Sequence, residues 1–229
     1  MKKLVIIRHG ESEWNQKNLF TGWVDVELSE KGKAEAKRAG ELMKEAGLDF
    51  DVCYTSYLKR AINTQQIALK VMEREWLPVI KSWRLNERHY GALSGLNKKE
   101  TAEKYGDEQV HIWRRSFDVR PPQMEEDNVY SARKNPAYRD VPVEDVPMCE
   151  SLKDTIARTV PYFENEIKPL VMEGKRVFIA AHGNSLRSLI KYFENISDED
   201  IINVEIPTGT PLVYEFGDDF KVTNKYYLK

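Results

Sequence analysis

The stretch Val5-Ile6-Ile7-Arg8-His9-Gly10-Glu11-Ser12 begins as an apolar run and turns polar at Arg8. A similar pattern returns late in the chain as Val177-Phe178-Ile179-Ala180-Ala181-His182-Gly183-Asn184-Ser185. Each apolar run is typical of a buried strand, and the glycine after each histidine allows the backbone to turn sharply. Open α/β sheets bind ligands beyond the carboxyl ends of their parallel strands, so the two runs predict that His9 and His182 meet in one crevice.

Helical and strand patterns alternate on both sides of these runs. Ser29 is a suitable N-cap for a helix that runs to about Ala46, and Ser151 with Asp154 resembles a capping box. The other expected elements are a loop over 14–28, strands at 52–55, 79–83 and 176–181, helices over 58–72, 98–105 and 108–117, a helix after Ser151 that Pro161 kinks, a helix with apolar residues at 186, 189, 190 and 193, and a hairpin of 211–216 and 221–227. This β-α-β-α order predicts a three-layer α/β/α fold with a mostly parallel central sheet.

Residues 1–229 are expected to form one α/β domain, because the chain length suits a single large core. Residues 118–149 interrupt the alternation with five prolines and few apolar residues. A long irregular stretch within a compact domain is usually a functional loop, a lid or a disordered segment. We interpret 118–149 as a lid-like excursion over the active site.

Composition excludes several classes of protein. The formal net charge of the 229-residue chain is -2, which argues against a general nucleic-acid binder. The two cysteines form no metal-binding motif and suggest a reducing compartment. Met1 to Leu4 runs directly into a short strand, and no stretch approaches membrane-spanning length. We therefore expect a cytoplasmic protein without nucleic-acid or membrane partners.

His9 stands where a nucleophile would be useful. A neutral imidazole can attack phosphorus to form a phosphohistidine, and nearby cations favour the neutral ring. Arg8 directly precedes His9 and could provide such a charge while also binding phosphate oxygens in a bidentate geometry. The sequence therefore suggests a nucleophilic His9 inside an anion pocket.

A metal centre is the alternative use of two histidines, because two imidazoles and a carboxylate can form a facial triad for iron. Several cationic side chains oppose a metal ion if they share the crevice, namely Arg8, Arg60, Lys98, Arg114 and Arg115. The same side chains would suit a polyanionic ligand. We therefore expect no metal at this site.

Five segments resemble those of one superfamily. Arg8-His9-Gly10-Glu11-Ser12 resembles the hallmark of the histidine phosphatase (phosphoglycerate mutase-like) superfamily. Two longer runs look like narrower signatures of the 2,3-bisphosphoglycerate-dependent phosphoglycerate mutases, and they are Trp83-Arg84-Leu85-Asn86-Glu87-Arg88-His89-Tyr90-Gly91-Ala92-Leu93 and Trp113-Arg114-Arg115-Ser116-Phe117-Asp118. Ala181-His182-Gly183-Asn184-Ser185-Leu186-Arg187 and Ile206-Pro207-Thr208-Gly209 continue the match, which covers essentially the whole chain. The resemblance implies a phosphoglycerate mutase-like fold.

The resemblance also implies roles at the matching positions. His9 would carry the phosphoryl group, and Glu87 would be the general acid and base at the substrate hydroxyl. His182 would donate to the phosphoryl oxygens in the transition state, together with Arg8 and Arg60. The other implied substrate-binding residues are Asn15, Thr21, Gly22, Tyr90, Lys98, Arg114, Arg115, Gly183 and Asn184.

The implied reaction is the glycolytic and gluconeogenic interconversion of 3-phosphoglycerate and 2-phosphoglycerate. Phospho-His9 would transfer its group to the 2-hydroxyl, and the bound 2,3-bisphosphoglycerate would return its other phosphate to His9. The resemblance thus implies 2,3-bisphosphoglycerate as primer, small phosphoglycerates as ligands, and a homodimer, because relatives are often dimers or tetramers.

Two other functions fit part of the pattern. A phosphatase on the same scaffold would keep both histidines and both arginines but hydrolyse phosphomonoesters, and the two longer runs favour the mutase. A non-catalytic binder of phosphorylated ligands would take up no covalent label.

Some relatives extend beyond the last strand with a tail that closes the site. Since this chain stops at Lys229, we expect greater leakage to water.

Overall fold

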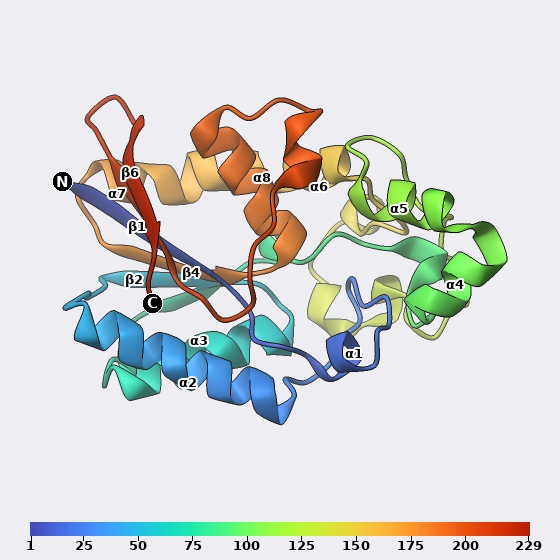
Figure 1. Cartoon of the computed structure of the whole chain (residues 1–229), viewed down its shortest axis with the longest axis horizontal. Helices are drawn as coiled ribbons and strands as arrows, with labels where there is room; N and C mark the ends of the chain where they lie inside the picture. The colour runs from blue at the N-terminus through green and yellow to red at the C-terminus, as the bar shows by residue number, and fades with distance from the viewer.

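The computed structural model describes residues 1–229 and contains a six-stranded sheet between two helical layers (Figure 1). The strands run in the order β3-β2-β4-β1-β5-β6 across the sheet. Their bounds are β1 (Lys2–Arg8), β2 (Val52–Thr55), β3 (Val79–Lys81), β4 (Val177–Ala181), β5 (Leu212–Phe216) and β6 (Val222–Tyr227). The first four are parallel to one another, whereas β5 and β6 form the antiparallel hairpin. The expected three-layer α/β/α fold with a mostly parallel sheet is confirmed.

Helices cover both faces of this sheet. Their bounds are α1 (Glu13–Gln16), α2 (Glu30–Glu45), α3 (Lys59–Val71), α4 (Lys98–Tyr105), α5 (Asp107–Arg115), α6 (Leu152–Tyr162), α7 (Lys168–Met172) and α8 (Gly183–Glu194). Figure 1 shows α2 and α3 on one face and α6, α7 and α8 on the other, with α4 and α5 beyond the end of the sheet. None of the helices combines the length and apolar composition needed to cross a bilayer.

The core is divided by the sheet into two parts. Leu4 and Ile6 of β1 pack in the cluster that contains residues of α8, whereas Val5 and Ile7 pack in the cluster that contains residues of α2 and α3. Successive side chains of a strand point to opposite faces, so a strand covered on both faces must be apolar throughout. This requirement explains the continuous apolar run that precedes Arg8.

Two helices begin at the expected capping residues. The Ser29 hydroxyl accepts from the Gly32 amide at the start of α2, and Ser151 with Asp154 forms the expected capping box of α6. Pro161 lies inside α6, and a π-helical turn (Phe163–Ile167) connects that helix to α7.

The expected loop over 14–28 is wrong at its start, because α1 occupies Glu13–Gln16. Ser12 caps this helix, and the Ser12 amide donates to the Asn15 side chain at 3.0 Å. The helix has no buried residue, so no apolar periodicity announces it.

Residues 118–149 contain three short 3-10 helices, Ala132–Lys134, Pro136–Tyr138 and Val143–Asp145. Ala132, Tyr138 and Val146 are buried in a small cluster with Trp23 and Trp83. The Tyr138 ring stacks on the Trp23 ring with centroids 5.0 Å apart. This segment therefore packs against the first loop and the 83–85 turn.

Candidate active site

The two histidines meet because β1 and β4 are neighbouring parallel strands. Arg8 lies opposite Ala181 in the register, so His9 and His182 leave the sheet together at its carboxyl edge. The His9 amide donates to the Ala181 carbonyl at 3.0 Å, and the two ring centroids are 5.0 Å apart. Both imidazoles are buried, and His9 is 3% exposed. The prediction that the two imidazoles meet at this edge of the sheet is confirmed.

The hydrogen bonds of His9 define its tautomer. Nδ1 lies 2.6 Å from the Gly10 carbonyl oxygen, which can only accept, so Nδ1 carries the proton. Nε2 lies 3.3 Å from the Arg60 Nε, which can only donate, so Nε2 carries a lone pair. Burial lowers the pKa of His9 well below its ordinary value of 6.5, and the charges of Arg60 and Arg8 lower it further. Nε2 is therefore an unprotonated, potentially nucleophilic atom.

Arg60 connects His9 to the first loop. It lies in the first turn of α3, and its side chain is buried. Its two terminal nitrogens donate to the Val24 and Gly22 carbonyls at 2.9 and 2.6 Å. Burial lowers the pKa of Arg60 to about 10, so the guanidinium stays charged at neutral pH. One cation thus fixes the loop and faces the lone pair of His9.

His182 is positioned by a residue that sequence reasoning missed. The His182 Nε2 lies 2.8 Å from the Ser56 hydroxyl, and that hydroxyl also accepts from the Leu58 amide at 3.1 Å. Burial lowers the pKa of His182 well below 6.5, with Arg60 and His9 as further causes. His182 lies against His9 and does not line the pocket described next. Its proposed donation to a phosphoryl group stays a prediction.

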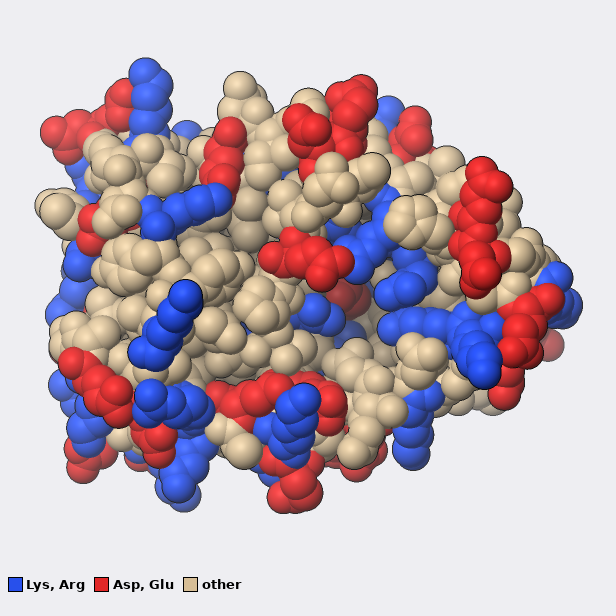
Figure 2. Space-filling view, viewed as in Figure 1, with Lys and Arg blue, Asp and Glu red and all other residues tan.

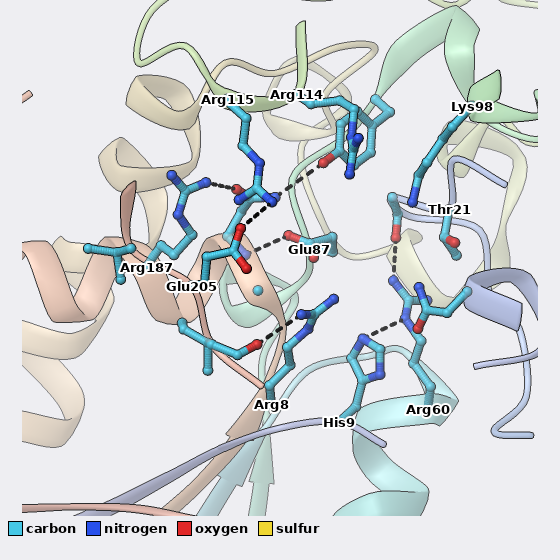
Figure 3. Close-up of a pocket in the computed structure, with 17 residues that line it drawn as sticks. Arg8, His9, Thr21, Arg60, Glu87, Lys98, Arg114, Arg115, Arg187 and Glu205 are labelled. Carbon is cyan, nitrogen blue, oxygen red and sulfur yellow. Dashed lines mark hydrogen bonds and ion pairs between the residues drawn. The ribbon is translucent and has the colours of Figure 1, made fainter. Parts of the chain in front are cut away.

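A pocket opens beside His9 (Figure 3). All twelve residues expected to bind substrate line it, and they are Arg8, Asn15, Thr21, Gly22, Arg60, Glu87, Tyr90, Lys98, Arg114, Arg115, Gly183 and Asn184. They come from strands, helices and loops far apart in sequence, which the fold brings together at one edge of the sheet. Their individual roles remain predictions.

The pocket is strongly cationic although the whole chain is slightly acidic. Six lining residues are cationic, namely Arg8, Arg60, Lys98, Arg114, Arg115 and Arg187, and two are carboxylates, namely Glu87 and Glu205. Burial lowers the pKa of Lys98 to about 8, and Arg114 is the next cause. Figure 2 shows Lys and Arg side chains gathered around the hollow next to the α4 and α5 region. Such a field attracts polyanions and repels metal ions.

Four lining residues were not predicted, namely Arg187, Val204, Glu205 and Ile206. Arg187 follows Asn184 by one helical turn of α8, and its guanidinium donates to the Asn184 side chain at 2.9 Å. That spacing could have identified Arg187, because residues three apart share a helix face. The 204–206 loop has no such pattern, although the Ile206 carbonyl accepts from Arg8 at 2.9 Å.

Glu87 lines the pocket at the start of α8. One carboxylate oxygen accepts from two backbone amides, that of Arg88 at 2.8 Å and that of Asn184 at 3.0 Å. Trp23 Nε1 donates to the Glu87 carbonyl at 2.6 Å. These contacts fix the carboxylate at the start of α8, facing the cations of the pocket.

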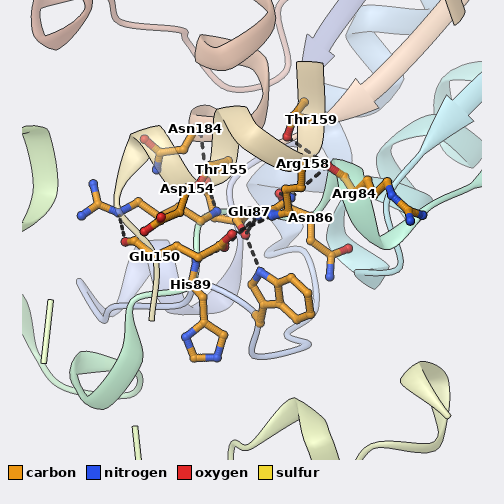
Figure 4. A network of polar contacts seen from close by, with 12 residues as sticks. Arg84, Asn86, Glu87, His89, Glu150, Asp154, Thr155, Arg158, Thr159 and Asn184 are labelled. Carbon is orange, nitrogen blue, oxygen red and sulfur yellow. Dashed lines mark hydrogen bonds and ion pairs between the residues drawn. The ribbon is translucent and has the colours of Figure 1, made fainter. Parts of the chain in front are cut away.

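A buried ion pair supports the loop that carries Glu87 (Figure 4). Arg158 of α6 lies 2.8 Å from the Glu150 carboxylate, and both side chains are buried. Arg158 also donates to three carbonyls of this loop, those of Arg84, Asn86 and Glu87. Glu150 accepts from the His89 amide at 2.9 Å. The sequence did not indicate this pair, because its two members are separated from the loop by more than sixty residues.

The buried guanidinium of Arg88 extends this network toward the pocket arginines. It donates to four carbonyls, those of Trp113, Arg114, Val119 and Glu150. The end of α5, which carries Arg114 and Arg115, is thereby attached to the Glu87 loop. A fully buried cation is tolerated here because its donors are paired with carbonyl oxygens.

No residue of 118–149 lines the pocket, and the expected role of this segment as a lid stays a prediction. Its buried residues pack against Trp23 and Trp83, and the Tyr138 hydroxyl accepts from the Asn86 side chain at 2.8 Å. The segment therefore supports the Glu87 loop through the contacts of its apolar residues with Trp23 and Trp83 and through the hydrogen bond between Tyr138 and Asn86.

Replacing Arg158 with alanine should strongly destabilise the protein. The change leaves the Glu150 carboxylate buried without its charge partner, a defect that costs about 3–5 kcal/mol. Urea unfolding would measure the loss. As a control, Arg38→Ala removes two pairs between exposed side chains, those with Glu41 and Glu45, and should change the free energy of unfolding by less than about 0.5 kcal/mol. Equal unfolding midpoints for the Arg158 variant and the unmodified protein would contradict the expectation.

Mild acid should also destabilise the fold. Burial lowers the pKa of His9 and His182 well below 6.5, and it lowers the pKa of His89 to about 4. As the pH falls below 6.5, the unfolded chain binds protons at these rings and the folded protein does not. The free energy of unfolding therefore decreases with falling pH, by up to about 1.4 kcal/mol per pH unit for each ring. Urea midpoints at about pH 7.5 and about pH 5 test this, and equal values would contradict it.

Comparisons with known proteins agree with this geometry. Residues 4–142 match the family model described as histidine phosphatase superfamily (branch 1). A 2,3-bisphosphoglycerate-dependent phosphoglycerate mutase of Treponema denticola is 64% identical over 226 residues, which cover 99% of this chain and 92% of that protein. One from Lactobacillus johnsonii is 60% identical and covers 100% of this chain and 99% of that protein.

Solved structures share the fold at low identity. A mycobacterial glucosyl-3-phosphoglycerate phosphatase superposes with a TM-score of 0.72 at 22% identity, covering 99% of this chain and 97% of that one. The α-ribazole phosphatase from Shigella flexneri superposes with a TM-score of 0.73 at 18% identity, covering 99% of this chain and 96% of that one. At these identities the likeness concerns the fold alone.

Proposed function

This chain belongs to the 2,3-bisphosphoglycerate-dependent phosphoglycerate mutases of the histidine phosphatase superfamily, and we propose that His9 is the residue that carries its phosphoryl group. The chain is a phosphoglycerate mutase, an isomerase that interconverts 3-phosphoglycerate and 2-phosphoglycerate. The observation that supports His9 is the lone pair on its Nε2, which Arg60 keeps unprotonated beside a pocket lined by six cations. No other histidine lines this pocket.

The proposed cycle begins with phospho-His9 and bound 3-phosphoglycerate. The 2-hydroxyl attacks phosphorus while Glu87 accepts its proton, and the bond from phosphorus to Nε2 breaks. The resulting 2,3-bisphosphoglycerate reorients in the pocket. Nε2 then attacks the other phosphate, Glu87 returns the proton to the departing oxygen, and 2-phosphoglycerate leaves. Atoms and charge balance over the cycle, and free 2,3-bisphosphoglycerate serves as the primer.

The cations provide the stabilisation that such a transfer needs. Phosphoryl transfer depends mainly on positioning and on charges around the phosphoryl oxygens. Arg8 and Arg60 flank His9, and His182 lies close enough to act with them. Lys98, Arg114 and Arg115 would bind the carboxylate and the second phosphate at the far side of the pocket.

We further propose one catalytic domain for residues 1–229 and a homodimer in the cytoplasm. The two halves of the core share β1 and β4, which supports a single domain. Ile80 on the edge strand β3 and nearby Trp76 are exposed, and an exposed apolar edge suits a second copy of the chain. Sedimentation equilibrium tests the dimer, which a monomer at micromolar concentration would exclude.

Primed isomerisation is the direct test of function. The conversion of 3-phosphoglycerate to 2-phosphoglycerate should require a trace of 2,3-bisphosphoglycerate and should proceed unchanged in EDTA, because the pocket supplies its charge without a metal ion. If phosphate release outpaced isomerisation, the phosphatase alternative would replace the mutase. Loss of activity in EDTA would instead require a metal ion in the mechanism.

A further inference from the structure

One of the two carboxylates in the pocket, that of Glu205, carries a negative charge that would repel the anionic ligands proposed for this pocket. Glu205 lies on the loop after the 3-10 helix Asp200–Asn203, and its carboxylate pairs with Arg115 at 3.0 Å (Figure 3). The Glu205 side chain is 76% exposed and the Arg115 side chain is 27% exposed. Glu87 accepts two backbone N–H donors, whereas Arg115 is the only hydrogen-bond partner of the Glu205 carboxylate. Glu205 is therefore the loosely attached acid of an otherwise cationic wall.

Glu205 and an anionic ligand compete for the same guanidinium. Arginine binds carboxylates and phosphates through the same planar set of donors, so Arg115 cannot serve both fully. A ligand phosphate beside Arg115 would also lie close to the Glu205 carboxylate, and like charges repel. An exposed ion pair is weak, so a ligand can displace it at small cost. The next residue, Ile206, is held in place because its carbonyl accepts from Arg8. This contact keeps the Glu205 backbone at the rim of the pocket even when the Glu205 carboxylate turns away from Arg115.

We propose that Glu205 determines ligand specificity as a counter-charge: it occupies Arg115 in the empty pocket and weakens the binding of each ligand in proportion to that ligand's negative charge. The inference rests on the proposed function for the identity of the ligands. A ligand with two phosphates and a carboxylate is penalised more than one with a single phosphate. Glu205 thereby limits how long 2,3-bisphosphoglycerate occupies the pocket relative to the monophosphates.

The variant E205Q separates this role from a structural one. Glutamine keeps the size of the side chain and can still accept from Arg115, but it removes the negative charge. A residue that merely orients Arg115 would tolerate glutamine or would lose affinity, whereas removal of a counter-charge increases affinity. The direction of the change therefore distinguishes the two roles.

The chain contains a closely matched control pair. Glu126 and Arg133 also form an ion pair, their side chains are 71% and 26% exposed, and neither lines the pocket. E126Q thus removes the same charge from the same kind of contact at a distance from the ligand. If the net charge of the protein alone affects anion binding, the affinity changes in both variants. If the charge inside the pocket matters, the affinity changes only in E205Q.

Titration calorimetry with the full chain gives the test. E205Q should bind 2,3-bisphosphoglycerate about fivefold more tightly, which corresponds to about 1 kcal/mol, and 3-phosphoglycerate about twofold more tightly, while E126Q matches the unmodified protein. Inorganic pyrophosphate, which requires no phosphoglycerate recognition, should also bind more tightly to E205Q. Equal or weaker binding of all three probes to E205Q would overturn the proposal, as would an equal gain in E126Q.

This design separates the inference from the function on which it rests. The binding measurement needs no turnover. Failure of primed isomerisation would therefore refute the proposed function, while the affinities of E205Q and E126Q could still be compared. Conversely, an active mutase with unchanged affinities in E205Q would refute only the role of Glu205.

Discussion

Replacing His9 with alanine should reduce isomerisation by at least about 10⁴-fold, because the enzyme loses the atom that we propose forms the covalent intermediate. The same change should abolish the acid-labile label that 2,3-bisphosphoglycerate leaves on the protein. No second histidine lines the pocket, so no other lining side chain could form a phosphohistidine. Quench measurements with labelled bisphosphate report the label, and a coupled assay reports the isomerisation.

His111 provides the control for this experiment. It lies on α5 with an exposed side chain and does not line the active pocket, so His111→Ala should retain both label and activity. Alanine at His9 deprives Arg60 of one acceptor, but it also removes a buried ring that resists protonation. We therefore expect the variant to fold. A label that persisted in folded His9→Ala protein would place the nucleophile elsewhere.

Glu87→Gln should reduce isomerisation by about 10²- to 10⁴-fold, the range expected for loss of a general acid and base. The glutamine oxygen can still accept from the amides of Arg88 and Asn184, so the wall should keep its shape. The amide cannot accept the substrate proton or return it to the departing oxygen. The protein should still bind ligand while failing to turn it over.

A substrate with an acidic leaving group makes this prediction specific. An aryl phosphate releases a phenolate that needs no protonation, so Glu87→Gln should still take up label at His9 from p-nitrophenyl phosphate. Its labelling by 2,3-bisphosphoglycerate should be slow. Glu144→Gln, a change on an exposed 3-10 turn, serves as the matched control. A loss of isomerisation smaller than about tenfold would remove Glu87 from the proton transfer.

The fold was predictable because its central strands are buried on both faces. The runs before Arg8 and His182 are apolar throughout, and a strand of that kind has few other environments available. The caps at Ser29 and Ser151 depend on contacts within three residues, so they also follow from local sequence. Helix α1 escaped prediction because it buries no residue and is stabilised by a single capping box.

The pocket was predictable only in part. Residues near His9 and His182 follow from the two strand ends, but the roles of Glu87 and Lys98 came from family resemblance and not from any pattern in the chain. The pair of Arg158 and Glu150 could not be identified, because its burial depends on a loop more than sixty residues away in the sequence. The position of 118–149 likewise depends on packing against Trp23 and Trp83.

The ion pair of Arg158 and Glu150 has a consequence for how the intermediate turns over. Segments open locally when they make few buried contacts and when their hydrogen bonds are exposed to solvent. The Glu87 loop differs on both counts, because its backbone is hydrogen-bonded to the buried side chains of Arg158 and Glu150. We therefore expect the loop that carries Glu87, the proposed proton acceptor, to stay in place during the reaction. In the proposed cycle we therefore expect the glycerate skeleton to rotate, so that its two phosphate esters face His9 and Glu87 in turn.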